Sequence, residues 1–476
     1  MLVSRPLRLA LIAFVVLLAL PAGAAEASPR MPICFYDDPS FRWAPASDIL
    51  ANLNAARAAH ASLVHVLADW SQIAPEKPKN PLNGDDPAYR LSDLDALVRT
   101  APRYNLQVFI TISGTPKWAN GGQTPNHPPT NLQDLTNFAH MLAARYNGRR
   151  PGFGAVTRWA VWNEPNLGLF LTPQFGPGGK IVSPAEYVKL YLAAYKGIKA
   201  GNPSAVVAAG ETSNRGRNHP TGGISDSVAP ATFAHLVALV DPKLPFAAWS
   251  EHPYPSEYRL GPLQKVAYPN VSLTNIDKFG ASLQQWFHRR VPIWITEWGE
   301  QTAPEYVGPS PGLGGVSHAQ QAKDAVTALH LAAASPYVQM FCWFILRDSS
   351  SQTWFSGLET KSGAKKPAYA RFAATAGTID GQTIAVAPNR YFTATIDVPF
   401  LTYHDLPGAP VGVTYRVYLG RSVAAIGQPL VHLAADQTVS FRVKFKPAKG
   451  MSYTMTVVVN DKHGQKATRT VALVPA

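Results

Sequence analysis

Short apolar runs alternate with longer stretches of helical periodicity from about residue 33 to residue 377. Runs of this length, bounded by turn residues, are typical of buried strands, and the stretches between them are typical of amphipathic helices. The expected strands are Ile33–Tyr36, Leu63–Leu67, Val108–Ser113, Arg158–Trp162, Val206–Ala209, Ala247–Glu251, Ile293–Thr296 and Gln339–Ile345. Eight strand-then-helix units predict class α/β and a closed parallel (β/α)8 TIM barrel over residues 30–377.

One helix start carries a specific signal. The segment Ser183-Pro184-Ala185-Glu186 has the pattern of a capping box with proline in the first turn. It predicts that the Ser183 hydroxyl caps a helix by accepting a hydrogen bond from the Glu186 amide.

The pattern changes near residue 378. Val439, Phe441, Val443 and Phe445 alternate with polar residues, which indicates a strand with one buried face. Similar alternation continues to the end of the chain without a helical stretch. Residues 378–476 are therefore expected to form a small antiparallel β-sandwich of immunoglobulin-like type that serves as an accessory domain.

The first 25 residues have the pattern of a secretory signal peptide. Arg5 and Arg8 precede the apolar run Leu9–Leu20, and small residues follow at Ala22–Ala24. The run is shorter than the ~20 residues of a membrane span. No later segment is apolar enough to span, so we expect a soluble protein that is secreted to the extracellular space or the periplasm.

Charge narrows the classes of partner. The formal net charge is +13, but no dense Lys/Arg run occurs, which argues against a nucleic-acid partner. Residues 378–476 hold ten Lys/Arg and five Asp, a net charge of +5. This excess is either an ordinary solvated surface or a means of association with an anionic cell-surface polymer.

Two short segments contain the candidate catalytic residues. They are Trp162-Asn163-Glu164-Pro165-Asn166 and Trp294-Ile295-Thr296-Glu297-Trp298. Each places a glutamate at the end of a predicted strand, the fourth and the seventh, and strand ends of a parallel barrel meet at one face. A pair of carboxyl groups, one protonated and one ionised, is what cleavage of a glycosidic bond requires.

With these residues in view, the barrel resembles the clan A glycoside hydrolases, the superfamily of cellulases and β-xylosidases. In that clan an Asn-Glu pair ends strand four and a second glutamate ends strand seven. The resemblance implies that Glu164 is the general acid/base, that Glu297 is the nucleophile, and that Asn163 binds the sugar 2-hydroxyl. A separation of ~5 Å between the carboxyl groups then implies double displacement with retention.

The resemblance extends to several further positions. Strand six ends in Glu251-His252-Pro253-Tyr254, where the clan has a His-X-Tyr that places a tyrosine near the nucleophile. It implies that Tyr254 donates to Glu297 and that His252 lines the sugar site. Trp343 matches the clan's aromatic residue under the sugar ring, although a core tryptophan is the alternative. Trp70 and Trp118 are further candidates for sugar stacking, and packing is the alternative for each.

One position departs from the clan. Where the clan usually has an arginine that keeps the nucleophile ionised, this chain reads Val64-His65-Val66. We expect either that His65 takes over as the donor to Glu297 or that a different donor serves, of which Arg347, just past the eighth strand, is one possibility. The alternative is a histidine beneath the site that bonds to the backbone and takes no part.

The remaining chemistry is sparse. No spacing of His, Asp, Glu or Cys suggests a metal, and no Gly-rich loop follows the first strand, so no cofactor is expected. Cys34 and Cys342 fall on the first and last strands, which are neighbours in a closed barrel. They either form a disulfide across the barrel seam or remain two buried thiols.

Taken together, the sequence favours a secreted retaining glycosidase that acts on an oligo- or polysaccharide. Two alternatives remain: a non-catalytic carbohydrate-binding barrel, and a transglycosidase that shares the covalent intermediate. The sequence does not distinguish the sugar, the linkage, or endo from exo action.

Overall fold

The computed structural model describes residues 31–255, 260–302, 315–349, 354–379, 383–397, 408–434, 438–460 and 466–475. The expected signal peptide, residues 1–25, lies outside the described residues. Among those described, no helix is both long and apolar enough to cross a membrane.

Eight parallel strands close into a barrel in the order β1 to β8, which confirms the predicted fold class. The strands are β1 (Ile33–Tyr36), β2 (Leu63–Asp69), β3 (Gln107–Ser113), β4 (Arg158–Val161), β5 (Val206–Ser213), β6 (Ala248–His252), β7 (Ile293–Trp298) and β8 (Val338–Phe344). β8 pairs with β1, so the seam closes where the sequence predicted. Each strand is a short apolar run because both of its faces are buried, one in the barrel interior and one under the helices.

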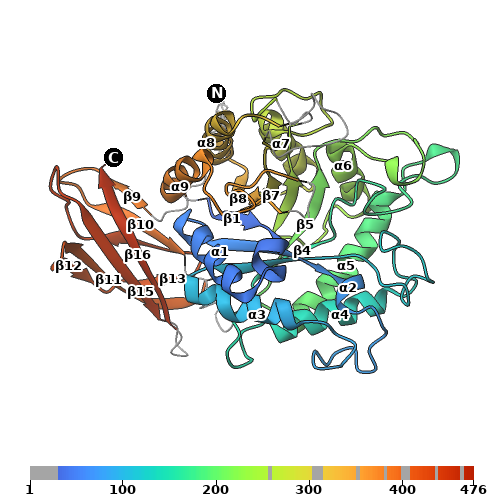
Figure 1. Cartoon of the computed structure of the whole chain (residues 1–476), viewed down its shortest axis with the longest axis horizontal. Helices are drawn as coiled ribbons and strands as arrows, with labels where there is room; N and C mark the ends of the chain where they lie inside the picture. The colour runs from blue at the N-terminus through green and yellow to red at the C-terminus, as the bar shows by residue number, and fades with distance from the viewer. Residues whose placement is uncertain are drawn as a thin grey trace, which may run out of the picture.

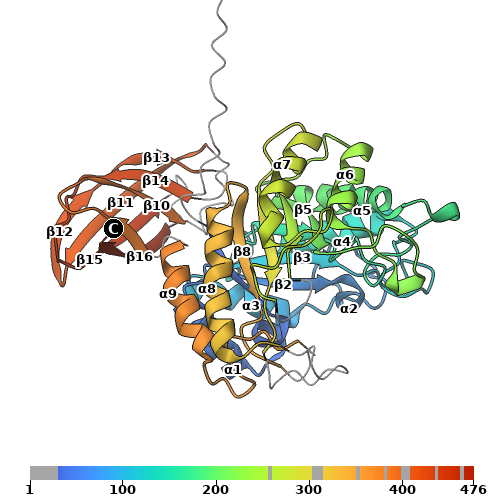
Figure 2. The same cartoon turned by 90° about the horizontal axis from the view of Figure 1, so that it is seen from above.

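The helices surround the barrel (Figure 1). They are α1 (Ala46–Ala58), α2 (Trp70–Ile73), α3 (Ser92–Thr100), α4 (Leu132–Arg145), α5 (Ser183–Gly201), α6 (Pro230–Val240), α7 (Ile276–Trp286), α8 (His318–Ala334) and α9 (Pro367–Ile379). Single turns are η1 (Pro39–Trp43), η2 (Ala101–Tyr104), η3 (Pro177–Gly179), η4 (Gly223–Ser225) and η5 (Leu273–Asn275). In Figure 2, α8 and α9 lie side by side on the outside of β8.

The start of α5 differs from the predicted capping box. Ser183 is the first helical residue rather than the cap, and the amide of Glu186 donates to the backbone oxygen of Val182. The Ser183 hydroxyl donates instead to Oε1 of Gln174, at 2.7 Å. The Ser183 hydroxyl therefore bonds to a residue outside the helix, Gln174, instead of capping the first turn of α5.

The strands after α9 form a separate body with its own core, drawn in orange to red in Figure 1. They are β9 (Thr383–Val386), β10 (Phe392–Asp397), β11 (Pro410–Leu419), β12 (Ser422–Gly427), β13 (Leu430–His432), β14 (Thr438–Val443), β15 (Tyr453–Asn460) and β16 (Lys466–Pro475). One sheet runs β12-β11-β15-β16-β9 with β13 also on β11, and β10 pairs with β14 in a second. This agrees with the predicted sandwich, and its described pairs are antiparallel except for β16 with β9.

Cys34 and Cys342 face each other directly in the β1–β8 register. Both are buried in the barrel interior with Phe109 and Trp294, and both are free thiols. Of the two outcomes that the sequence left open, the structure has the pair of buried thiols.

Candidate active site

Glu164 and Glu297 meet at the mouth of the barrel. Glu164 follows β4 and Glu297 lies near the end of β7, so both come from the carboxyl ends of strands. A carboxyl oxygen of each and a ring nitrogen of His252 all lie within 4.8 Å of one another. The side chains of Glu164 and Glu297 are 14% and 10% exposed, so both carboxyl groups can be reached from the mouth.

His252, at the end of β6, connects three carboxyl groups. Its Nδ1 lies 3.1 Å from Oε1 of Glu164 and 3.6 Å from Oε2 of Glu297. Its Nε2 lies 3.1 Å from Oε2 of Glu211. Burial opposes the charged ring, but Glu297 and the hydrogen bonds to Glu164 and Glu211 raise the pKa of His252 well above its ordinary value. The imidazolium therefore donates from both nitrogens and supplies a buried positive charge.

Glu211 follows the fifth predicted strand, Val206–Ala209, so the strand pattern already places a third carboxyl group near the barrel mouth, where it could bind a substrate hydroxyl. The pairing of β5 with β6 shifts between Ala209 and Thr212, which is a β-bulge at Gly210 and Glu211. Glu211 is buried and accepts from the Ser250 hydroxyl at 2.6 Å. Although burial acts the other way, the hydrogen bond and charge of His252 lower the pKa of Glu211. Glu211 thus holds His252 in place rather than contacting substrate.

Tyr254 contacts Glu297, as the resemblance implied. Its hydroxyl donates to Oε2 of Glu297 at 3.0 Å. Burial and the charge of Glu297 raise the pKa of Tyr254 well above its ordinary value, so the phenol keeps its proton and remains a donor. His252 and Tyr254 therefore support the Glu297 carboxylate from the same strand end.

Glu297 is nevertheless difficult to ionise in this structure. Burial, followed by the neighbouring charges of Glu164 and Glu211, raises the pKa of Glu297 to about 8, against the opposing effects of His252 and Tyr254. With this pKa, Glu297 holds its proton at neutral pH in this structure, and the charge of Glu164 is one of the causes.

The backbone around Glu164 is held in an uncommon conformation. Trp162 has φ 70° and Glu164 has φ 39°, both in the left-handed region. The amide of Trp162 donates to the Ile112 oxygen, and the amide of Glu164 donates to the Glu211 oxygen. Asn163 is buried between them, and its Oδ1 accepts no hydrogen bond among the described residues. Strained positions that neighbouring strands enforce are typical of functional sites.

The structure corrects the expectation that His65 or Arg347 is the donor to Glu297. His65 is fully buried; its Nδ1 lies 3.3 Å from the Thr296 oxygen and its Nε2 lies 2.7 Å from the Thr111 hydroxyl. Both nitrogens are therefore occupied beneath the site, as in the backbone-bonded alternative. Burial lowers the pKa of His65 to about 4, so the ring is neutral. Arg347 bonds to Glu359 instead, at 2.8 and 3.0 Å.

The structure also corrects the role of Trp343. This side chain points outward, where it packs on Trp298 and on Phe372 of α9 and donates to the Ser356 oxygen. Phe344, one residue later, points to the mouth. Its ring lies 6.5 Å from Tyr254 and 6.2 Å from Trp354, between centroids. The residue type at position 343 matches the clan. The alternation of side chains along β8, however, turns Phe344 rather than Trp343 toward the barrel mouth.

Trp70 and Trp118 lie together beside α4. Their rings form an edge-to-face pair with centroids 5.6 Å apart, and Trp70 also stacks on Phe138 of α4. Their predicted part in substrate binding stays a prediction.

Glu164, His252 and Glu297 are, in the described part of the chain, the one group with the spacing of three metal ligands. A metal-bound histidine must present a lone pair. In this structure Nδ1 of His252 instead lies 3.1 Å from Glu164 and 3.6 Å from Glu297, so the three side chains are partners of one another.

Comparison with known proteins finds similar folds but no similar sequence. No protein-family model matches the sequence, and no curated protein is significantly similar to it. A family 39 glycoside hydrolase from the gut symbiont Bacteroides cellulosilyticus WH2 is similar in structure, with TM-score 0.51, 16% identity, and coverage of 87% of this chain and 81% of that one. GH5_18 from Streptomyces cattleya, solved in complex with GlcNAc, has TM-score 0.51 and 16% identity over 76% of this chain and 83% of that one. The feature shared with both enzymes is the closed (β/α)8 barrel fold.

Proposed function

We propose that the protein is a retaining glycoside hydrolase with Glu164 as general acid/base and Glu297 as nucleophile. The observation that carries the proposal is the approach of the two carboxyl groups to within 4.8 Å at the barrel mouth. Retaining enzymes have carboxyl groups ~5–5.5 Å apart, whereas inverting enzymes need ~6.5–9.5 Å to admit a water molecule.

The reaction requires a proton on Glu164 and a negative charge on Glu297. A bound sugar brings its glycosidic oxygen to Glu164, which favours the proton on Glu164 and the charge on Glu297. Glu297 then attacks the anomeric carbon while the departing oxygen takes the proton from Glu164. In the second step water gives its proton to Glu164 and its hydroxyl to the anomeric carbon, which releases Glu297. His252 and Tyr254 stabilise the charge on Glu297 between these steps.

The sugar itself is expected to rest on aromatic side chains at the mouth. Phe344 and Trp354 both contact Tyr254, which places two apolar faces beside the nucleophile. Aromatic faces suit the apolar face of a pyranose ring. Asn163 offers an amide beside Glu164 for the 2-hydroxyl group. We further propose export through residues 1–25 and a role in polysaccharide degradation, in line with the signal pattern and the basic surface.

The test compares Glu164→Ala and Glu297→Ala on an aryl glycoside with a good leaving group. Both variants should lose nearly all turnover. Azide should rescue each by a different route, because it attacks the glycosyl-enzyme in Glu164→Ala and the substrate in Glu297→Ala. We expect a glycosyl azide of retained configuration from Glu164→Ala and of inverted configuration from Glu297→Ala.

The products decide between the readings. The opposite configurations would exchange the two roles. An unmodified protein that releases no sugar from a broad panel of glycosides, yet binds them, would identify the carbohydrate-binding alternative. Products longer than the substrate would identify the transglycosidase.

A further inference from the structure

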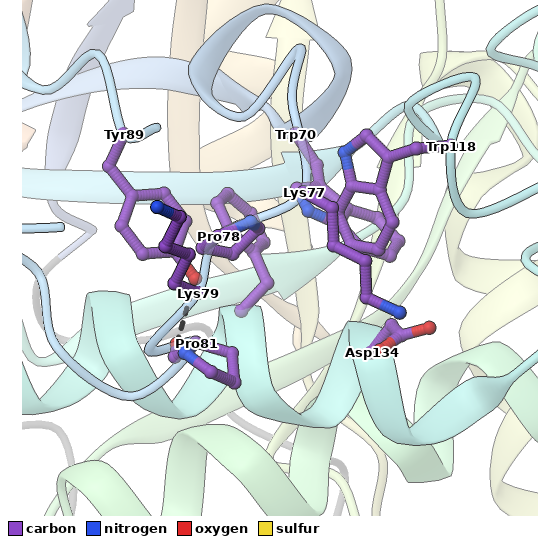
Figure 3. A pocket seen from close by; sticks show the side chains of 9 residues that line it. Trp70, Lys77, Pro78, Lys79, Pro81, Tyr89, Trp118 and Asp134 are labelled. Carbon is purple, nitrogen blue, oxygen red and sulfur yellow. Dashed lines mark hydrogen bonds between the residues drawn. The ribbon is translucent and has the colours of Figure 1, made fainter. Parts of the chain in front are cut away.

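A second cavity lies on the outside of the barrel, between the chain that follows β2 and the start of α4 (Figure 3). Its volume is about 150 Å³. The lining residues are Trp70, Lys77, Pro78, Lys79, Pro81, Tyr89, Trp118, Asp134 and Phe138. We refer to it as the α4 pocket.

The aromatic wall of the α4 pocket is fixed by packing. Trp70 is buried against Phe138, and its edge-to-face contact supports Trp118. The indole nitrogen of Trp118 donates to the Ala74 oxygen at 2.8 Å, and the Tyr89 hydroxyl donates to the Pro81 oxygen at 2.7 Å. A rigid, half-exposed indole is a preorganised surface, so a ligand does not bear the cost of ordering it.

Charged groups stand around this wall. The Lys77 ammonium lies 5.6 Å from the centre of the Trp118 ring, and Asp134 enters from the first turn of α4. Neither is in a salt bridge with another described residue. The α4 pocket thus combines an aromatic face with the carboxylate acceptor of Asp134 and the ammonium donors of Lys77 and Lys79, and these groups suit a sugar ring with its hydroxyl groups.

We propose that the α4 pocket binds one pyranose unit of a polysaccharide, at a distance from the bond that is cleaved. Pockets for drug-sized ligands measure ~300–1,000 Å³, so this smaller cavity suits a single ring. Its lining residues do not include Glu164, His252 or Glu297. The inference rests on the proposed function insofar as the polymer held here is the one cleaved at the barrel mouth.

Affinity electrophoresis of the full chain tests the proposal, with hydroxyethyl cellulose, glucomannan, arabinoxylan and polygalacturonate in separate native gels. At least one polymer should retard the parent protein. Trp118→Ala and Asp134→Asn should each weaken that binding about two- to tenfold, as the loss of one stacking or hydrogen-bonding contact predicts. Trp43→Ala is the matched control, because Trp43 is 60% exposed and lies outside the pocket.

Turnover of a small aryl glycoside should stay unchanged in all three variants, which also shows that they fold. If the parent binds polygalacturonate best and Lys77→Met loses that preference, the site binds acidic sugars. If the parent binds the neutral polymers best, the site binds neutral sugars. The proposal is overturned if no polymer retards the parent or if Trp118→Ala and Asp134→Asn bind like Trp43→Ala. If the parent cleaves no glycoside but the variants still lose binding, the proposed function fails while the site stands.

Discussion

At the scale of single residues, His252 controls the charge of the site. It faces Glu164, Glu297 and Glu211, and its positive charge offsets the repulsion among them. Only two of these partners lie at the mouth. The third, Glu211, is buried and serves to hold the proton on His252. The ionisation of Glu297 therefore depends on a carboxylate that substrate does not reach.

Glu211→Gln should move the pH profile of kcat/KM to lower pH. The amide can still accept from Nε2 of His252, but without the negative charge the pKa of His252 falls and its proton is lost at lower pH. At acid pH, where His252 is still charged, loss of the Glu211 charge removes one of the groups that raise the pKa of Glu297, so Glu297 ionises at lower pH. Both limbs of the profile should therefore move down in pH.

Glu251→Gln is the matched control for this prediction. Burial raises the pKa of Glu251 well above its ordinary value, so this neighbour of His252 is neutral and its replacement removes no charge. An equal shift of the profile in both variants would show a packing effect and would contradict the role of Glu211.

His65 should affect stability and not catalysis. Its pKa is about 4 when folded and 6.5 when free, so between these values the unfolded chain binds more protons than the folded one. Stability from this group is therefore fully present above pH 6.5 and is lost as the pH falls to about 4, by about 3 kcal/mol. His65→Gln should flatten the rise of Tm between pH 4 and 6.5 and leave the pH profile of kcat/KM unchanged. A shift of the kcat/KM profile in His65→Gln would instead support His65 as a donor to Glu297.

The sequence identifies the two glutamates and the His-X-Tyr segment because each ends a recognisable strand. It places Glu211 just past the fifth strand but does not predict its contact with His252, since nothing in Gly210-Glu211 indicates the bulge that turns the side chain inward. It also favours Trp343 over Phe344, because residue type is visible in a sequence and the exact phase of an apolar strand is not. Both misses concern the direction of a side chain rather than the presence of an element.

At the scale of the element, the bulge in β5 positions Glu211 and depends on Gly210. This residue has φ 107°, and a Cβ built there would lie 2.6 Å from the Ser250 oxygen and 2.7 Å from the Trp249 ring. Both neighbours belong to β6, the strand that ends in His252. The bulge therefore aligns the two buried members of the charge network across one strand pair.

Gly210→Ala should destabilise the barrel by about 3–5 kcal/mol, from overpacking added to the strain of a positive φ. Gly122→Ala isolates the second effect, because Gly122 has φ 87° and no described atom lies within 4 Å of the position that its new methyl group would take. This control substitution should cost about 1 kcal/mol. Urea unfolding measures both. Equal losses of unfolding free energy in the two variants would show that β6 shifts freely to admit the new methyl group and that the bulge is not tightly packed.

At the scale of the whole molecule, the repeating pattern suffices to predict the barrel. Eight units can bury their strands only if the sheet closes, and the register of β1 with β8 follows from that closure. The sandwich follows from alternation of period two, but the order of its strands does not, because parallel pairing of β9 with β16 joins segments far apart in the sequence. Long-range pairing of this kind leaves no local signal.

The position of α9 decides where the chain can be divided. Its Phe372 packs against Phe35 and Trp343, and the Tyr369 hydroxyl donates to the Ala55 oxygen at 2.6 Å, so α9 completes the barrel. The buried side chains of the later strands form a core of their own. A chain that ends after residue 379 should therefore fold, with cooperative thermal unfolding and unchanged turnover of an aryl glycoside.

A chain that ends after residue 366 is the matched control, and it should not fold, because loss of α9 exposes Phe35 and Trp343 to water. If residues 378–476 hold the enzyme near anionic polymer, the 379-residue chain should also lose salt-sensitive retention on polygalacturonate, since a net charge of +5 leaves with them. A folded 379-residue chain without any activity would mean that the sandwich supplies part of the active site. A 379-residue chain that fails to fold would mean that the sandwich braces the barrel.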